Sequence, residues 1–208
     1  MALGSPNRDR QAERRAATRR EIVDAAWAIA ASTGLAGITL REIAVRVGMR
    51  PPSLYSHFDS KLAIYDAMFG DAWRTYEARD AANEHRLTGP ARERLKRVAA
   101  HFFDFAVEVP TRYELMSQRT VPGFTPSTDS YEPAVRVLRR MTDLLVRLGV
   151  RDPAGTDLWV ALVGGLVDAQ LATDPGGTRW RRLLDRTVDM YADQMGLPTT
   201  PAQEGPRP

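Results

Sequence analysis

The stretch GITLREIAVRVGMRPPSLYSHFDSKLAIYDAM, residues 37–68, decides the fold of the N-terminal part of the chain. Residues 39–47 have the apolar spacing of a short helix, and Gly48 then interrupts the pattern. The spacing predicts a second short helix over residues 52–58, because Pro52 suits the first helical position. Two short helices joined by a tight glycine turn form a helix-turn-helix.

Each of these two helices has one face to bury. Ile43 and Ala44 give the first helix an apolar face, and Leu54 and Phe58, four residues apart, give one to the second. The polar and basic side chains of the second helix are therefore expected to be exposed. An exposed helix start with a guanidinium and hydroxyl groups suits the major groove of DNA, where such groups reach base edges and phosphates.

This region resembles the TetR/AcrR family of one-component transcriptional regulators. The resemblance lies in Thr-x-x-x-Ile-Ala-x-x-x-Gly followed by Ser-Leu-Tyr-x-His-Phe-x-x-Lys, and RREIVDAAWAIAASTGLAG at residues 19–37 resembles the family's first helix. It covers residues 18 to 70, roughly a quarter of the chain. It implies an all-α protein with an N-terminal three-helix helix-turn-helix domain and a larger C-terminal helical ligand-binding and dimerisation domain. It implies a regulator and not an enzyme.

The resemblance also implies which side chains meet DNA. Thr39, Tyr55, His57 and Lys61 match positions that contact phosphates or are ordered around them, and Arg41, Arg50, Pro51 and Ser53 match positions that face base edges. Taken one at a time, each has an alternative explanation. Tyr55 could pack with its hydroxyl group in water, and Ser53 with His57 lacks the carboxylate and oxyanion hole of a hydrolase.

Charge is distributed unevenly along the chain. Residues 1–61 contain ten basic and six acidic side chains, whereas the remainder is close to neutral. A basic head before a neutral body is typical of polyanion binding, and the arginines between Arg8 and Arg20 are expected near the minor groove or neighbouring phosphates. A basic surface that serves only solubility is the alternative.

The rest of the chain has the periodicity of helices nearly throughout, about nine in all. We expect a flexible basic arm at residues 1–17, a helix-turn-helix domain at 18–62, a ligand-binding and dimerisation domain at 63–196 and a disordered tail at 197–208. The proline-rich segment 119–131 is either a lid over a pocket or a surface connection.

Aromatic and methionine side chains are frequent in the larger domain. Such residues line pockets for apolar or flat ligands, although ordinary core packing explains any single one of them better. The resemblance implies an effector pocket here. The expected ligand-binding residues are Trp73, His101, Phe102, Phe105, Tyr113, Met116, Gln118, Trp159 and Asp168.

A helix with apolar residues on nearly all faces is predicted over residues 156–172. A second subunit would cover it, and the resemblance implies a homodimer through the last two helices. The sequence Trp159 to Gly164 departs from the Trp-His-Gly signature of one branch of the family, since Val163 replaces the histidine. Gly164 and Gly165 could instead reflect close helix packing.

Composition excludes several classes of protein. The 208 residues include no cysteine and three histidines, which leaves no thiolate chemistry and little material for a metal site; we expect no metal and no cofactor. The longest apolar run is too short to span a membrane, so we expect a cytoplasmic protein. Two other functions stay open: a small-molecule binding dimer without sequence-specific DNA recognition, and an enzyme using His101, Asp104 and Glu108.

Overall fold

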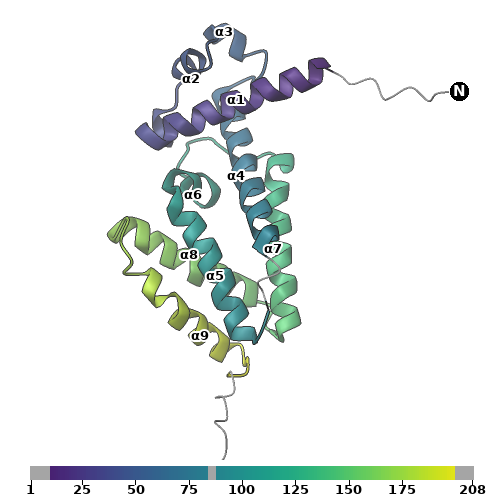
Figure 1. Ribbon diagram of the computed structural model, residues 1–208, viewed down its shortest axis with the longest axis vertical. Coiled ribbons are helices and arrows are strands. Elements are labelled where there is room, and N and C mark those ends of the chain that lie inside the picture. The colour runs from purple at the N-terminus through teal and green to yellow at the C-terminus, as the bar shows by residue number, and fades with distance from the viewer. Residues whose placement is uncertain (1–9, 84–87, 200–208) are drawn as a thin grey trace, which may run out of the picture. The chain divides into compact units, whose positions relative to one another are not determined.

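The protein is all-α in a computed structural model that describes residues 10–83 and 88–199. Nine α-helices and no strand occur in these residues, which confirms the fold class predicted from the sequence. The α-helices are α1 (Arg10–Thr33), α2 (Leu40–Arg46), α3 (Pro51–Leu54), α4 (Lys61–Asn83), α5 (Ala91–Glu108), α6 (Pro110–Ser117), α7 (Thr128–Leu148), α8 (Gly155–Thr173) and α9 (Leu184–Gln194) (Figure 1). Two short 3₁₀ helices are η1 (Leu35–Gly37) and η3 (Arg181–Leu183).

The chain divides into two compact units. Unit 1 consists of the described residues of 1–72 together with 114–131, and unit 2 consists of the described residues of 73–113 and 132–208. The first half of α4 therefore belongs to unit 1 and its second half to unit 2.

Unit 1 is built on the apolar face of α1. Ile22, Ala26 and Ile29 recur at helical spacing on that face and are buried, as the periodicity predicts. Ile43 of α2 and Leu54 of α3 are also buried, with 0% and 1% of their surface exposed. Helices this short are not stable in water by their own hydrogen bonds. Burial of these side chains therefore supplies most of their stability.

The turn between α2 and α3 depends on Gly48. Its φ of 68° is a left-handed conformation that glycine adopts without a steric penalty. The amide of Met49 donates to the carbonyl of Ala44 at 2.8 Å and the amide of Gly48 to that of Val45 at 3.2 Å. These two bonds are the pattern of a Schellman motif, which ends α2 and turns the chain sharply.

Unit 2 has its own hydrophobic core. It is formed where α5 packs against α8 and α9, with Phe103, Trp159 and Tyr191 among the buried side chains. Arg92 of α5 is buried as well, at 6% exposure, and its guanidinium group holds the chain just after α9. The buried hydroxyl group of Tyr191 donates to the carbonyl of Gly155 at 2.9 Å, and burial raises its pKa to about 12.

Several boundaries differ from the sequence prediction. Residues 10–17 of the predicted arm belong to α1, while residues 1–9 lie outside the described part of the chain. The second helix of the helix-turn-helix begins at Pro51 and not at Pro52, and it ends at Leu54, after which the chain continues as turns to residue 57. A run of two prolines at the start leaves few amides to bond within such a short helix.

Two further differences lie near the end of unit 1 and at the end of the chain. The segment predicted as a lid or connection extends to residue 131, yet α7 begins at Thr128, where the Ser127 hydroxyl accepts from the amide of Ser130 and caps the helix. Leu197, placed in the predicted tail, is buried in unit 2 and its carbonyl accepts a bond from Arg92. Residues 200–208 lie outside the described part.

Candidate functional site

Residues 50–58, which we call the recognition segment, form the exposed edge of unit 1. Arg50 precedes α3 in an extended conformation, and Pro51 occupies its first position. Leu54 and Phe58 point into the core, with 1% and 3% of their surface exposed. Tyr55 and Ser56, between these two anchors, are exposed, as the spacing predicts.

Most of the predicted DNA-binding residues share this exposed surface. Thr39 caps α2 by accepting from the amide of Glu42 at 3.2 Å, and its own hydroxyl group donates to the Glu42 carboxylate at 2.8 Å. Tyr55 is 55% exposed although it is aromatic. The side chains exposed to solvent are Thr39, Arg41, Arg50, Pro51, Ser53 and Tyr55.

His57 and Lys61 are half-buried. The Lys61 ammonium group lies 5.5 Å from the centroid of the Tyr65 ring, within range of a cation–π contact. Tyr65 donates to the carbonyl of Leu35 at 2.5 Å, and burial raises the pKa of its hydroxyl group. The two residues are therefore nearer to the core of unit 1 than the sequence suggests.

Two arginines of α1 contact the recognition segment. Arg15 donates to the carbonyl of Ser56 at 3.1 Å, and Arg19 donates to the carbonyl of His57. The sequence analysis directed the arginines of this region toward DNA and did not find these contacts. The only signal was their spacing of four residues, which places them on one face of a helix.

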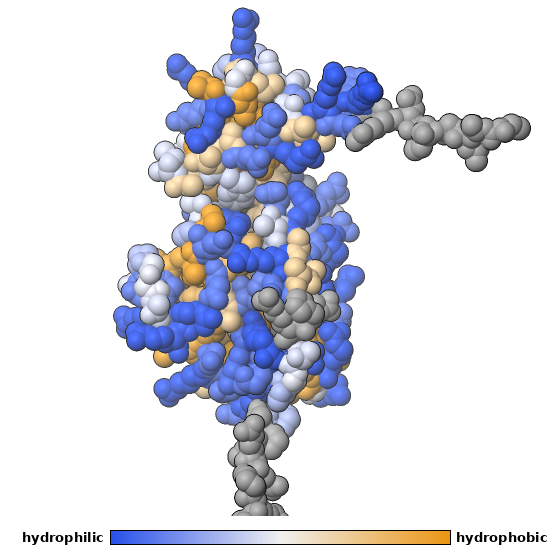
Figure 2. Space-filling view, viewed as in Figure 1, coloured by the Kyte–Doolittle hydropathy of each residue, from blue (hydrophilic) through white to orange (hydrophobic). Residues whose placement is uncertain are grey.

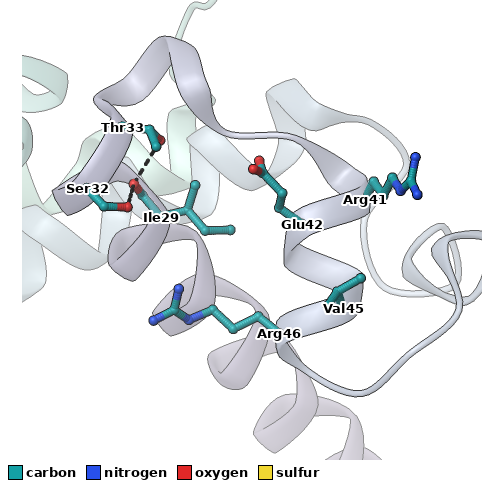
Figure 3. A pocket seen from close by; sticks show the side chains of 7 residues that line it. All are labelled: Ile29, Ser32, Thr33, Arg41, Glu42, Val45 and Arg46. Carbon is teal, nitrogen blue, oxygen red and sulfur yellow. Dashed lines mark hydrogen bonds between the residues drawn. The ribbon is translucent and has the colours of Figure 1, made fainter.

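A shallow groove of about 390 Å³ lies between α1 and α2 (Figure 3). Ile29, Ser32 and Thr33 of α1 form one side, and the hydroxyl groups of Ser32 and Thr33 both donate to the Ile29 carbonyl. The other side consists of Arg41, Glu42, Val45 and Arg46 of α2. Val45 is 73% exposed there. The groove mixes both charges with an apolar side chain, so its chemistry favours no single ligand class.

The segment 119–131 is anchored on α4 within unit 1. Phe124 packs against the rings of Tyr65 and Phe69, at centroid distances of 6.1 and 6.2 Å. The Asp66 carboxylate accepts from the amide and the hydroxyl group of Ser127, each at 2.7 Å, and from the Ser130 hydroxyl group. These contacts fix the segment to the start of α4.

Five of the predicted ligand-binding residues gather in unit 2. Their common neighbour is Tyr76, a buried residue that the sequence analysis did not place in the site. Its ring centroid lies between 5.0 and 6.2 Å from those of four aromatic neighbours, and burial raises the pKa of its hydroxyl group. We call this group the aromatic cluster: Trp73, Tyr76, His101, Phe102, Phe105 and, through Phe102, Tyr113.

The other four predicted ligand-binding residues lie elsewhere. Trp159 packs against Tyr191 at a centroid distance of 5.3 Å, and Asp168 is exposed on α8. Met116 and Gln118 belong to unit 1, where Met116 is buried and Gln118 is exposed. A ligand role for these residues stays a prediction.

The alternative catalytic residues were His101, Asp104 and Glu108, and both carboxylates form ion pairs with arginines. Asp104 accepts two bonds from Arg181, at 2.7 and 3.2 Å, and Glu108 pairs with Arg79. The bond from Arg79 lowers the pKa of Glu108, while burial lowers the pKa of His101. Two carboxylates already occupied by arginines are poorly suited to general acid–base catalysis with His101.

The last helices expose apolar side chains in the single chain. Trp159 and Val163 of α8 are buried in unit 2, whereas Leu158, Val160 and Leu162 are 41%, 51% and 38% exposed. Hydrophobic side chains reach the surface of the molecule in several places (Figure 2). The expectation that α8 is buried on all sides is therefore not met within one chain. Among the described residues, no helix has the length and hydropathy to cross a membrane.

The fold and the exposed recognition segment define a helix-turn-helix protein. Residues 22–68 match the model of the family described as bacterial regulatory proteins, tetR family. The match covers the helix-turn-helix part of the chain, and the family that it names is one of regulatory proteins. The resemblance identified in the sequence is confirmed.

Relatives and solved structures agree with this assignment. The HTH-type transcriptional regulator YobS of Bacillus subtilis, itself uncharacterised, is 32% identical over 99 residues, which are 47% of this chain and 50% of YobS. The class D tetracycline repressor of Escherichia coli is 38% identical over 50 residues, or 24% of this chain and 23% of that protein. The chain thus spans half the length of the first relative, or less for the second.

Two crystal structures share the fold over nearly the whole chain. The candidate regulatory protein SCO4313 has a TM-score of 0.72 and 21% identity, with 91% of this chain and 100% of that chain covered. FadR of Bacillus subtilis, solved with stearoyl-CoA, has a TM-score of 0.66 and 15% identity, with 83% and 96% covered. At such identities the likeness concerns the fold alone.

Proposed function

We propose that this protein is a ligand-responsive transcriptional repressor that binds a palindromic operator as a homodimer and leaves it when a small apolar or aromatic effector binds. One observation carries the proposal: the recognition segment lies within the part that matches the family model, and it exposes Arg50, Ser53 and Tyr55 to solvent while its two anchors are buried. Guanidinium and hydroxyl groups on a short helix start suit base edges and phosphates in the major groove. The protein would act in the cytoplasm, where the operator lies.

The proposed DNA contacts divide into two kinds. Arg41, Arg50 and Ser53, with Pro51, would face base edges, and Thr39, Tyr55, His57 and Lys61 would contact phosphates or be ordered by them. Two copies of the recognition segment would enter successive major grooves, about one helical turn or roughly 34 Å apart. The repressor role is supported by the tetracycline repressor among the relatives.

The proposed dimer uses α8 and α9. Leu158 and Leu162 of α8, with Met190 of α9 at 63% exposure, would be covered by the same helices of a second subunit. Large apolar side chains exposed on adjacent helices are typical of a protein–protein interface. Replacement of Leu158 by Glu would place a charge there and is expected to shift the protein toward monomers in analytical ultracentrifugation.

The proposed effector site is the aromatic cluster of unit 2. Its rings suit a flat or apolar ligand, and His101 offers a polar group beside the Tyr76 ring at a centroid distance of 5.6 Å. FadR, which shares the fold, binds stearoyl-CoA in its crystal structure, and an apolar effector would fit that precedent. The effector would release DNA by binding the state with low operator affinity more tightly than the other. α4, which belongs to both units, would be the lever.

The test is a selection of DNA fragments from the source genome, repeated at two salt concentrations. A sequence-specific dimer will recover fragments that share one two-fold symmetric site, and their affinity will fall with salt because phosphates are neutralised. Recovery of unrelated fragments that are lost at higher salt would contradict the proposal and favour a small-molecule binding dimer.

Two kinds of variant then separate the proposed roles. Arg50→Ala is expected to cost about 1–3 kcal/mol on the operator and to relax the sequence preference, because it removes a base contact. Lys61→Ala and Tyr55→Phe are expected to weaken binding to all DNA alike. An unchanged sequence preference in Arg50→Ala would show that this residue reads no base.

A further inference from the structure

The recognition segment is short, and two of its backbone hydrogen bonds are long. α3 is four residues long, and the next two amides, of Tyr55 and Ser56, donate to carbonyls at 3.3 Å, near the limit for a hydrogen bond. A helical turn of this length does not persist in isolation. Contacts from another element must therefore hold the shape in which its side chains are presented.

α1 supplies those contacts through two arginines one turn apart. Arg15 donates through Nη2 to the carbonyl of Ser56 at 3.1 Å, and Arg19 donates through Nη1 to the carbonyl of His57. Both carbonyls belong to the C-terminal end of the recognition segment, where backbone oxygens carry partial negative charge. A guanidinium group there satisfies both the charge and the hydrogen-bonding capacity of these oxygens.

Arg19 makes a second contact with the same segment. Its guanidinium carbon lies 3.9 Å from the centroid of the Phe58 ring, and Phe58 is only 3% exposed. A planar guanidinium group can stack on a ring and direct its N–H donors sideways at the same time, which a lysine cannot do. Arg19 therefore links a buried anchor of the segment to its backbone.

We propose that Arg15 and Arg19 are positioning residues, which hold the recognition segment in its DNA-reading shape and thereby set sequence specificity. This inference rests on the proposed function. It replaces the expectation that these two arginines contact DNA phosphates. Because the bonds end on backbone carbonyls, they constrain the segment whatever side chains it carries.

The first test compares Arg19→Gln with its exposed neighbour variant Arg20→Gln. The affinity of each is measured on the selected operator and on an unrelated duplex at several salt concentrations. A positioning role predicts that Arg19→Gln binds the operator about 10-fold more weakly than Arg20→Gln does. The affinity for the unrelated duplex would be the same for both variants, and so would the slope of log affinity against log salt concentration.

Other outcomes of that comparison would overturn the inference. A phosphate contact at Arg19 predicts an equal loss on both duplexes and a salt slope smaller by about 1. Equal operator affinity of the two variants would leave Arg19 without a positioning role. Arg15→Gln, compared with Arg14→Gln, is expected to show the same pattern with a smaller loss, because Arg15 is exposed and makes one contact.

The second test requires no DNA. The amides of His57 and Phe58 both donate to the Leu54 carbonyl at 2.9 Å, and their hydrogen exchange can be followed by NMR in the full chain. Arg19→Lys keeps the charge and so favours a folded protein. It is expected to accelerate hydrogen exchange of these two amides about 10-fold relative to the amide of Val47, the residue that follows α2. Equal exchange in this variant and the unchanged protein would overturn the inference.

The two tests separate failure of the inference from failure of the proposed function. If the unchanged protein selects no DNA site, the proposed function fails, while hydrogen exchange still decides whether α1 orders the recognition segment. If a site is selected and Arg19→Gln behaves like Arg20→Gln, only the positioning role fails.

Discussion

Two arginines, one in each unit, hold backbone carbonyls near a helix end in different surroundings. Arg19 of unit 1 is half-buried and holds the recognition segment. Arg92 of unit 2 is 6% exposed and donates to the carbonyls of Pro198 at 2.9 Å and Leu197 at 2.8 Å. It also bonds the Asp193 carboxylate at 2.6 Å.

The same interaction, a guanidinium group that donates to backbone carbonyls, has different effects when it is buried and when it is half-buried. Around Arg92, loss of the guanidinium group would leave the buried carbonyl of Leu197 without a donor, which is costly away from water. Near Arg19, water can replace the lost donor. A buried guanidinium group therefore stabilises the fold, whereas a half-buried one mainly fixes the orientation of a surface segment.

The largest expected effect tests the buried side of this comparison. Arg92→Ala is expected to lower the free energy of unfolding by about 1–3 kcal/mol, because it leaves the buried carbonyl of Leu197 without its donor. Urea unfolding followed by circular dichroism measures it. Arg97→Ala, an exposed change one turn and a half further along α5, should stay within about 0.5 kcal/mol. Similar losses in the two variants would refute the argument from burial.

A smaller effect is expected where unit 1 depends on backbone conformation. Gly48→Ala is expected to destabilise the protein by about 1–2 kcal/mol, because alanine at a φ of 68° has its Cβ too close to the backbone. Thermal unfolding monitored by circular dichroism checks it. Gly165 lies in mid-helix, and an added Cβ would meet no atom of another residue within 4 Å. Gly165→Ala is therefore expected to raise the free energy of unfolding by about 0.5–1 kcal/mol. If Gly165→Ala instead lowers the stability of the dimer, Gly165 lies at a contact between subunits.

The smallest effect concerns pH and unit 2. Burial lowers the pKa of His101 from its ordinary 6.5, so the unfolded chain binds this proton more tightly than the folded one. Stability is therefore expected to be fully present above pH 6.5 and to decline as the pH falls toward the folded pKa. The pKa of Glu77, lowered by its bond to Arg136, falls below 4.5 and contributes outside this window.

The measurement for this effect is the free energy of unfolding of His101→Gln and of the unchanged protein at several pH values between 5 and 7.5. The variant should show a flatter dependence on pH. Parallel curves would mean that His101 is equally easy to protonate in both states.

Local features of the sequence were enough to predict the helix-turn-helix. Ile43, Leu54 and Phe58 are buried as their spacing indicates, and Gly48 forms the predicted turn. The exposure of Arg50 and Tyr55 followed from the same spacing. Such features depend on neighbours within a few residues, and helical periodicity describes these directly.

Boundaries were harder to predict than elements. The start of α7 at Thr128 depends on the Ser127 cap, and several residues nearby were suitable, whereas α3 begins at Pro51 without a side-chain cap bond from Arg50. Similarly, the nine candidate ligand-binding residues were chosen by residue type alone. Four of them meet around Tyr76, a fifth, Tyr113, packs on Phe102, and the other four lie elsewhere, because residue type says nothing about which helices are neighbours.

The sequence by itself determined the all-α class, the match of residues 22–68 to the TetR family and the outward face of the recognition segment, since each is encoded in short-range spacing. Only the tertiary structure decided what each arginine holds. The bond from Arg19 to His57 spans 38 positions and that from Arg92 to Leu197 spans 105. Partners so far apart meet only when helices pack, and packing depends on the shape of every side chain between them.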